Sequence, residues 1–267
     1  MLTPLDPLDF TGKVVLVTGG AKGVGRGLST AFLTAGAHVV ICGRSEPPEL
    51  PLGGGRAAVF VATDVRDAEQ VERLVANATE RFGRLDVLVN NAGGSPYAEA
   101  ATASPRFFSK ILELNLTAAF IAAQRANAVM QRQDEGGSII NIASVSGTRP
   151  SPGTAAYGAA KAGLLNLTQT LAVEWAPKVR VNAVTGGMIR TEQAHLHYGD
   201  DAGIASVGAT VPLGRLAEPR EIADVCLFLA SPLASYVNGA AIMVHGGGER
   251  PAFLDAAKNT TSAPPRR

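Results

Sequence analysis

Short apolar runs rich in β-branched residues alternate along this chain with longer segments of helical periodicity. The apolar runs cover residues 13–18, 38–42, 58–63, 85–90, 138–143, 179–184 and 241–246. Strands that are buried on both faces have near-continuous apolar runs of this kind, and parallel strands need helical crossovers between them. The alternation therefore predicts a doubly wound α/β fold, with helices on both faces of a parallel sheet and ligands at the carboxyl ends of its strands.

The connecting segments carry apolar stripes at helical spacing. Their members are Val71, Leu74, Val75 and Ala78 in one segment, and Leu164, Leu167, Leu171 and Trp175 in another. Residues three or four apart share a helix face, so both stripes are expected to face the core. Gly36 predicts a left-handed cap after the first helix, and Asp67 or Ala68 predicts the start of the next. Glycines 53 to 55 predict a flexible loop.

Length and composition favour one domain. The chain has 267 residues, of which 46% are hydrophobic, and this is enough for one substantial core. We expect an N-terminal extension at residues 1–10 and a single domain at residues 11–248. Residues 249–267 are rich in Pro, Ala, Ser and Thr, so we expect a disordered tail there.

Charge and cysteine content narrow the class of protein. The 24 basic and 23 acidic residues nearly cancel, to a net charge of +1, which argues against a nucleic-acid partner. Cys42 and Cys226 lie in apolar stretches and are expected to be core residues without a disulfide, which fits a cytoplasmic protein. The N-terminus lacks a signal-peptide pattern and no run of 18 apolar residues occurs, so we expect neither secretion nor a membrane.

A glycine-rich turn, TGGAKGVG at residues 18–25, follows the first predicted strand and opens onto a predicted helix. Glycine leaves the backbone unobstructed, and the N–H groups at a helix N-terminus attract anions. The turn therefore predicts a site for a pyrophosphate.

Tyr157 and Lys161 stand four residues apart in a predicted helix, thirteen residues after Ser144. Residues i and i+4 share a helix face, so the Lys161 ammonium can lie beside the Tyr157 phenol. A free tyrosine has a pKa of roughly 10, and a nearby cation favours its phenolate. We expect Lys161 to lower the pKa of Tyr157 and make it an acid/base at neutral pH.

These motifs together resemble the short-chain dehydrogenase/reductase family over residues 10–248. The resemblance rests on the glycine turn, the NNAG turn at residues 90–93, Asn115 in LELNLT, Ser144 after NIA, and the Tyr157 and Lys161 pair. It implies a single Rossmann-like domain with a seven-stranded, mostly parallel sheet, a nicotinamide cofactor, and a homotetramer or homodimer. Residues 191–211 correspond to the family's variable substrate lid.

The resemblance also implies a role for each member of a catalytic tetrad. Tyr157 corresponds to the general acid that protonates a carbonyl, or the base that deprotonates an alcohol. Ser144 corresponds to the residue that holds the substrate oxygen. Lys161 corresponds to the residue that lowers the tyrosine pKa and binds the nicotinamide ribose, and Asn115 to the residue that holds a proton-relay water. Taken singly, each has an ordinary structural alternative as a helix, turn or surface residue.

The same resemblance implies a set of cofactor contacts: Gly19, Lys22, Gly23, Val24, Gly25, Arg44, Asp64, Val65, Asn91, Ala92, Gly93, Tyr157, Lys161, Gly187, Ile189 and Thr191. NAD-preferring relatives commonly place an aspartate where this chain has Gly43. Arg44 follows at once and Lys22 lies in the glycine turn, so two cations can face a 2′-phosphate. We expect NADP(H) to be preferred, with NAD(H) possible. The alternative is that Arg44 stacks on adenine and Lys22 points to solvent.

Two positions depart from the family's pattern. Gly186 replaces a usual proline, so we expect a less rigid loop after the sixth strand, and His245 replaces a common aspartate near the C-terminal interface. The residues expected to line the substrate pocket are Tyr97, Val145, Met188 and His195. His195 and His197 lie near Asp200 and Asp201, but no further ligand spacing supports a metal site, and we expect none.

The predicted function is that of an NAD(P)(H)-dependent oxidoreductase that interconverts a ketone and a secondary alcohol by direct hydride transfer, with a mostly apolar small-molecule substrate. The first alternative is reduction of a 3-oxoacyl thioester on acyl carrier protein or CoA, which uses the same tetrad. A further alternative is a cofactor-binding sensor without turnover. Enoyl reduction fits less well, because that branch has a wider Tyr-to-Lys spacing.

Overall fold

Seven parallel strands form one central sheet in the computed structural model of the chain, which describes residues 6–251 and residue 253. The strand order is β5-β2-β1-β6-β7-β8-β9, and every neighbouring pair in it is parallel. The strands are β1 (Val14–Thr18), β2 (His38–Gly43), β5 (Val59–Ala62), β6 (Val87–Asn90), β7 (Gly137–Ser144), β8 (Val179–Gly186) and β9 (Ala241–Val244). The prediction of a doubly wound, Rossmann-like α/β fold is confirmed.

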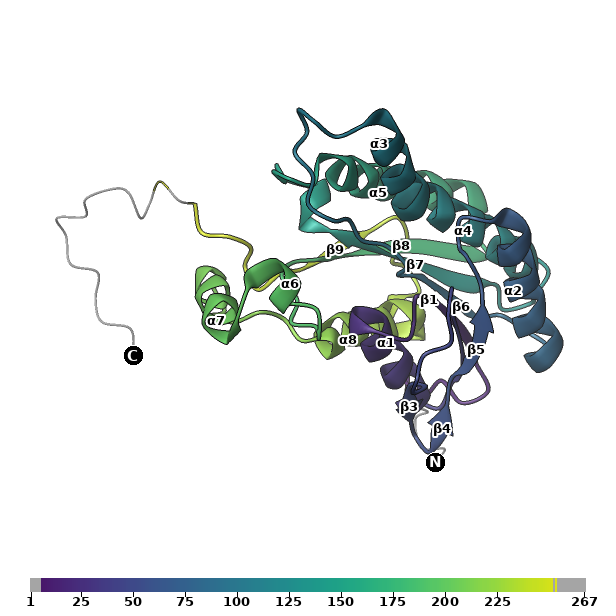
Figure 1. Cartoon of the computed structure of the whole chain (residues 1–267). Helices are drawn as coiled ribbons and strands as arrows, with labels where there is room; N and C mark the ends of the chain where they lie inside the picture. The colour runs from purple at the N-terminus through teal and green to yellow at the C-terminus, as the bar shows by residue number, and fades with distance from the viewer. Residues whose placement is uncertain (1–5, 252, 254–267) are drawn as a thin grey trace.

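Helices cover both faces of this sheet, as Figure 1 shows. One layer contains α2 (Ala68–Phe82), α4 (Ala118–Met130) and α5 (Ala155–Trp175), with α3 (Pro105–Leu112) packed on α5. The other contains α1 (Gly23–Thr34) and α8 (Pro219–Ala230), which pack against each other. The chain order of the strands reverses between β1 and β6, and open α/β sheets bind their ligands at such a point.

Strand β1 supplies the core on both faces of the sheet. Val15 and Val17 point into the cluster under α1 and α8, whereas Val14 and Leu16 point into the cluster under α2 and α4. All four side chains are at most 1% exposed. Each such burial stabilises the fold by about 1.5–3 kcal/mol, which explains why the strand is apolar at every position.

The predicted helix features are confirmed. The stripe from Val71 to Ala78 is buried in α2. In α5, Leu164 and Leu171 are buried, and Leu167 and Trp175 are partly buried against the cluster that contains Leu171. The Asp67 carboxylate caps α2 by accepting from the N–H groups of Glu69 and Gln70, and Gly36 has the positive φ, +95°, of a left-handed residue after α1.

The flexible loop expected at glycines 53 to 55 is instead a two-stranded antiparallel hairpin, and that expectation was wrong. Strands β3 (Leu52–Gly53) and β4 (Arg56–Ala57) pair with each other, and Gly54 and Gly55 form the turn with φ of +55° and +73°. Two-residue hairpin turns of type I′ need positive φ at both central residues, which glycine adopts without steric cost. The hairpin packs on α1.

Beyond the sheet, α6 (His195–Tyr198) and α7 (Asp201–Thr210) lie within residues 191–211, the segment expected to be a substrate lid, and they project from the body in Figure 1. The division into extension, domain and tail stays a prediction. Phe10, at the end of the proposed extension, is 4% exposed and packs edge-on against Phe32. Most of the tail lies outside the described residues. Cys42 and Cys226 are buried free thiols, and no helix in the described ranges is long and apolar enough to span a membrane.

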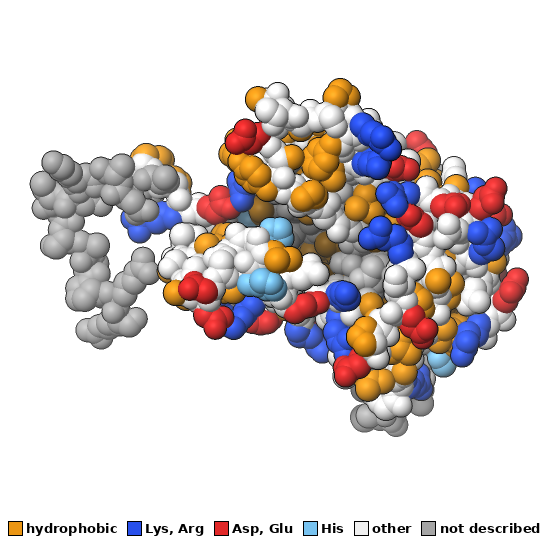
Figure 2. Space-filling model, viewed as in Figure 1, with side chains coloured by type: hydrophobic (Ala, Val, Ile, Leu, Met, Phe, Trp, Pro, Cys, Tyr) orange, Lys and Arg blue, Asp and Glu red, His pale blue; other side chains and the backbone are white. Residues whose placement is uncertain are grey.

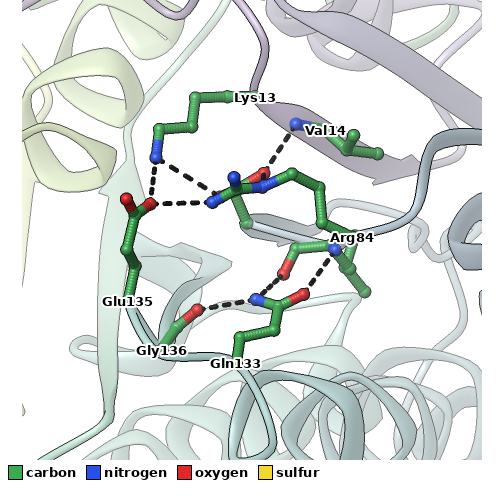
Figure 3. A network of polar contacts seen from close by, with 8 residues as sticks. Lys13, Val14, Arg84, Gln133, Glu135 and Gly136 are labelled. Atoms are coloured by element: carbon green, nitrogen blue, oxygen red, sulfur yellow. Dashed lines mark hydrogen bonds and ion pairs between the residues drawn. The ribbon is translucent and has the colours of Figure 1, made fainter.

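A polar network ties the start of β1 to the segments that precede β6 and β7. The buried Asp86 carboxylate accepts from the Val14 N–H at 2.8 Å and from Arg84 Nε and Nη2. Arg84 also binds Glu135, which pairs with Lys13, and these pairs are drawn in Figure 3. Asp86 is 8% exposed, so its carboxylate oxygens are satisfied by these partners instead of by bulk water.

We expect Asp86→Ala to lower the free energy of unfolding by about 3 kcal/mol, because it leaves the buried Val14 N–H without an acceptor and removes one of the two carboxylates that pair with Arg84. Glu135→Ala removes an exposed partner of the same network and should cost less than about 1 kcal/mol. Urea denaturation of both variants measures the difference. Equal losses in the two variants would contradict the ranking.

Candidate active site

Helix α5 carries Tyr157 and Lys161 on one face. The Lys161 Nζ lies 5.5 Å from the centroid of the Tyr157 ring and donates to the Ile142 carbonyl at 2.7 Å. Lys161 is only 3% exposed, and this burial lowers its pKa to about 8. The four-residue spacing therefore produces the expected proximity, with the ammonium tied to β7.

Ser144 ends β7 next to this helix. Its hydroxyl accepts from the Ser146 N–H at 3.2 Å and is hydrogen-bonded to the Tyr157 phenol. The expectation that Lys161 lowers the pKa of Tyr157 is not met in this structure. Burial raises the pKa of Tyr157, and the Ser144 hydrogen bond opposes that rise, because the phenolate loses more hydration than its neighbours replace.

Asn115 lies in a π-helical turn, Glu113–Thr117, between α3 and α4. Its amide donates to the carbonyls of Ile111 and Gly94, and its Oδ1 accepts from the Gly94 N–H at 2.8 Å. A Cβ on Gly93 would lie 2.6 Å from Asn115 Oδ1 and 3.5 Å from Lys161 Nζ. Gly93 therefore lets Asn115 and Lys161 approach each other beneath the NNAG turn.

A cavity of about 610 Å³ runs along the carboxyl ends of the strands, and Figure 2 shows this face of the molecule hollowed, with Lys and Arg side chains along one rim. Every predicted cofactor contact lines this cavity, as do Ser144, Tyr157 and Lys161. Asn115 does not line it and lies behind Gly93. Sequence analysis missed several lining residues: Cys42, Thr63, Arg66, Gly94, Leu114, Ile142, Ala143, Glu192 and Gln193.

The glycine turn at one end of the cavity fits a phosphate-bearing group. A Cβ on Gly25 would collide with the Gly19 carbonyl oxygen, and Gly23 has a φ of +51°. These glycines let the turn close tightly so that the N-terminus of α1 faces the cavity. Free N–H groups at a helix N-terminus are a suitable site for an anion.

Arg66 adds a cation to this end of the cavity that the sequence analysis did not identify. Its guanidinium binds the Asp64 carboxylate through Nε at 2.9 Å and Nη2 at 2.5 Å. This hydrogen bonding, with a smaller contribution from the charge of Arg44, lowers the pKa of Asp64 to about 2. An arginine two residues after the aspartate was the only signal for this pair in the sequence.

A second cavity of about 230 Å³ lies next to the first and shares Gly187 with it. The other lining residues are Val145, Arg149, Met188, His245, Gly248 and Glu249. Of the four residues expected at the substrate pocket, Val145 and Met188 line this cavity. Tyr97 is 74% exposed and packs on Gly153, and His195 lines a different cavity, which it shares with Glu192 and Asp201.

The two departures from the family's pattern have structural consequences. Gly186 is the last residue of β8 and pairs with Ser144 on one side and Val244 on the other, so sheet pairing holds it where a flexible loop was expected. His245 packs against Gly187 and lines the second cavity. In the described part of the chain no group of His, Cys, Asp and Glu side chains is arranged to hold a metal ion.

Comparison with known proteins gives consistent matches along almost the whole chain. The family model for enoyl-(acyl carrier protein) reductase matches residues 19–249. An L-rhamnose 1-dehydrogenase (NAD(P)(+)) of Azotobacter vinelandii is 37% identical, over 88% of this chain and 96% of its own length. Among solved structures, a short-chain type dehydrogenase/reductase from Mycobacterium marinum is 32% identical with a TM-score of 0.84, over 93% of this chain and all of that one.

The chain belongs to the short-chain dehydrogenase/reductase family.

Membership in the short-chain dehydrogenase/reductase family makes this protein an oxidoreductase with an NAD(P) cofactor. The relatives act on varied substrates. The aldohexose dehydrogenase of Thermoplasma acidophilum, for example, is 30% identical with a TM-score of 0.83, over 96% of this chain and 98% of that one. The family thus settles the class of reaction and leaves the substrate and the choice between NAD and NADP open.

Burial of Lys161 predicts a pH dependence of stability. Its native pKa is about 8, against an ordinary value of 10.5, so between these pH values the unfolded chain holds a proton that the native chain has released. Stability rises with pH wherever the unfolded state binds more protons. The free energy of unfolding of the unmutated protein minus that of Lys161→Met should therefore rise between pH 8 and pH 10.5, by at most about 3 kcal/mol.

Urea denaturation of both proteins between pH 7 and pH 10.5 measures this difference. Below about pH 8 the difference between the two proteins should be constant, because Lys161 is then protonated in both states. A difference that stays constant over the whole range would contradict a depressed pKa.

Proposed function

We propose that this protein interconverts a ketone and a secondary alcohol, with direct hydride transfer between the substrate carbon and the nicotinamide of NADP(H). The observation that carries the proposal is the convergence of Ser144, Tyr157 and Lys161 at one end of the cavity whose other end is the glycine turn. The bound dinucleotide supplies the hydride acceptor or donor, and the protein supplies orientation and proton transfer.

Tyr157 is the proposed general acid/base. Its phenol is protonated at neutral pH, because burial raises its pKa, so it is ready to donate a proton to a carbonyl oxygen during reduction. Ser144 is the proposed second partner of that oxygen. Its hydroxyl lies beside the Tyr157 phenol, and both groups line the cavity, so one substrate oxygen can meet both. In the oxidative direction the same phenol must lose its proton, and the hydrogen bond from Ser144, which lowers the pKa of Tyr157, favours that loss.

Lys161 and Asn115 are the proposed route for the proton. The Lys161 ammonium donates one hydrogen bond to the Ile142 carbonyl. Its pKa of about 8 lets it exchange a proton near neutral pH. Asn115 lies on the far side of Gly93 from the cavity, beside Lys161 Nζ. A water between these two groups would carry the proton onward, as the resemblance to the family implies.

The second cavity supports a substrate with hydroxyl groups. At its edge Arg149 forms an ion pair with Glu249, so a cation and a carboxylate meet the substrate together. A neutral hydroxyl can accept from the guanidinium and donate to the carboxylate, whereas an anionic substrate would have to compete with Glu249. This modifies the expectation of a mostly apolar substrate, and the sugar-oxidising relatives agree with it.

Two further proposals concern assembly and cofactor choice. The homotetramer or homodimer implied by the family is supported by exposed apolar side chains on helices α3, α4 and α5, namely Phe108, Phe120 and Val173. The preference for NADP(H) is supported by Lys22, Arg44 and Arg66 around the adenosine end of the cavity.

We expect Tyr157→Phe to reduce kcat by about 10²–10⁴-fold, because general acid/base catalysis typically contributes that factor. The affinity for NADPH should change by less than about threefold, since the ring remains in place. NADPH oxidation with a panel of ketones, and NADP⁺ reduction with secondary alcohols and aldoses, measure turnover, while calorimetry measures binding. Tyr236→Phe, at a fully exposed tyrosine, is the matched control and should keep full activity.

Unchanged turnover in Tyr157→Phe would remove Tyr157 from the mechanism. Tight NADPH binding by the unmutated protein without turnover of any substrate in the panel would favour the cofactor-binding sensor. Turnover of a 3-oxoacyl thioester alone would favour the thioester reductase.

We expect Arg44→Asp to shift the ratio of NADPH to NADH affinity towards NADH by at least about tenfold, because it places a carboxylate where a 2′-phosphate would lie and a 2′-hydroxyl could bond. Calorimetric titration of both cofactors into the unmutated and variant proteins gives the ratio. Arg73→Asp, a charge reversal on the exposed side of α2, should leave it unchanged. An unaltered ratio in Arg44→Asp would dismiss Arg44 as the selector.

A further inference from the structure

Helix α1 lacks a cap of its own at the end that faces the cavity. Its N-cap residue, Lys22, makes no side-chain cap, and its first turn contains no acidic residue. The first N–H groups of a helix have no partner within the helix and carry part of its positive dipole. The N-terminus of α1 therefore depends on an acceptor from elsewhere.

A carboxylate from the lid segment supplies that acceptor. Glu192 Oε1 accepts from the Gly23 N–H at 2.9 Å across 169 residues of sequence. The neighbouring Thr191 is also close, since a Cβ on Gly23 would lie 3.4 Å from Thr191 Cγ2. Glu192 lines the same cavity as the glycine turn, so its negative charge lies where the proposed cofactor would place its pyrophosphate.

Glu192 is also the point where the lid leaves the body. Just before it, Arg190 donates its N–H to the Ala217 carbonyl, which holds the chain to the segment ahead of α8. Just after it, the Ala194 N–H bonds the Thr191 carbonyl, and the Glu192 carbonyl contacts His195 Nδ1 at the start of α6. A movement of Glu192 away from Gly23 would therefore move the first turn of the lid.

We propose that Glu192 is an internal competitor for the cofactor phosphates: its carboxylate occupies the anion site of α1 and must leave when the dinucleotide binds, which couples cofactor binding to the position of the lid. This proposal rests on the proposed use of a dinucleotide at that site. Two anions cannot share the same N–H groups without strong repulsion, so the carboxylate and the pyrophosphate exclude each other. Displacement of the Glu192 carboxylate by the pyrophosphate lowers the affinity for the cofactor. It also changes the position of residues 193–211 when the cofactor is bound.

Glu192→Gln tests the competition, because it removes the charge and keeps the size of the side chain. We expect NADPH, NADH and ADP each to bind about three- to tenfold more tightly to the variant, in line with a carboxylate at a helix N-terminus. Isothermal titration calorimetry on the full chain measures the three affinities. The control is Asp201→Asn, which removes a carboxylate from the first turn of α7. Asp201 lines a cavity that Glu192 and His195 also line. This variant should leave the three affinities unchanged.

ADP separates this proposal from the proposed function, since it carries the pyrophosphate without a nicotinamide. Tighter ADP binding by Glu192→Gln supports the competition even if no oxidoreductase activity is found. Unchanged or weaker binding of ADP and NADPH by Glu192→Gln would overturn it and leave Glu192 as a structural cap of α1. Equal tightening in Asp201→Asn would also overturn it, because the effect would then follow net charge alone.

Limited proteolysis gives an independent readout of the lid. In the unmutated protein, saturating NADPH should change the rate of cleavage within residues 193–211 by about threefold or more, because Glu192 has been displaced. In Glu192→Gln the rate should already differ from that of the unmutated protein without any ligand. The four samples are the unmutated protein and Glu192→Gln, each with and without NADPH. Identical cleavage in all four would overturn the coupling to the lid.

Discussion

The parallel alignment of the central sheet is the constraint on which the rest of the structure depends. Because all seven strands run the same way, their carboxyl ends meet along one edge, and segments far apart in the sequence deliver their loops to that edge. Strand β1 brings the glycine turn, β6 brings the NNAG turn, and β7 brings Ser144. The apolar character of β1 is therefore as necessary to the site as any polar residue, since its burial on both faces holds these loops together.

Burial stabilises the apolar strand β1, but it disfavours the charged forms of the ionisable groups at the Tyr157 end of the cavity. It lowers the pKa of Lys161 to about 8 and raises that of Tyr157, so both groups shift towards their neutral forms. The backbone limits the cost by providing partners, as the Ile142 carbonyl does for Lys161 and the Gly94 peptide does for Asn115. The π-helical turn at Asn115 belongs to the same arrangement, because it brings the amide to Gly94 without breaking the run from α3 to α4.

The opposite end of the cavity is dominated by unlike charges in contact. Arg66 pairs with Asp64, and Glu192 accepts from the Gly23 N–H at the N-terminus of α1. In both pairs a residue expected to meet a ligand, Asp64 or Gly23, already has an internal partner. The affinity of such a site for a ligand depends on the contacts that the ligand makes minus the internal contacts that it replaces.

By itself the sequence determined the architecture and identified many of the residues that line the cavity, although it missed others such as Arg66 and Glu192. The apolar runs, the helical stripes and the glycine turn are local patterns with a direct physical meaning, and residues such as Tyr157 and Lys161 meet because a helix brings positions four apart together. The tertiary structure alone decided the remaining features: the capping of Gly23 by Glu192, the pairing of Arg149 with Glu249, the place of Asn115 behind Gly93, and the rise in the pKa of Tyr157. These depend on contacts between distant segments and on burial, and neither quantity can be read from the order of residues along the chain.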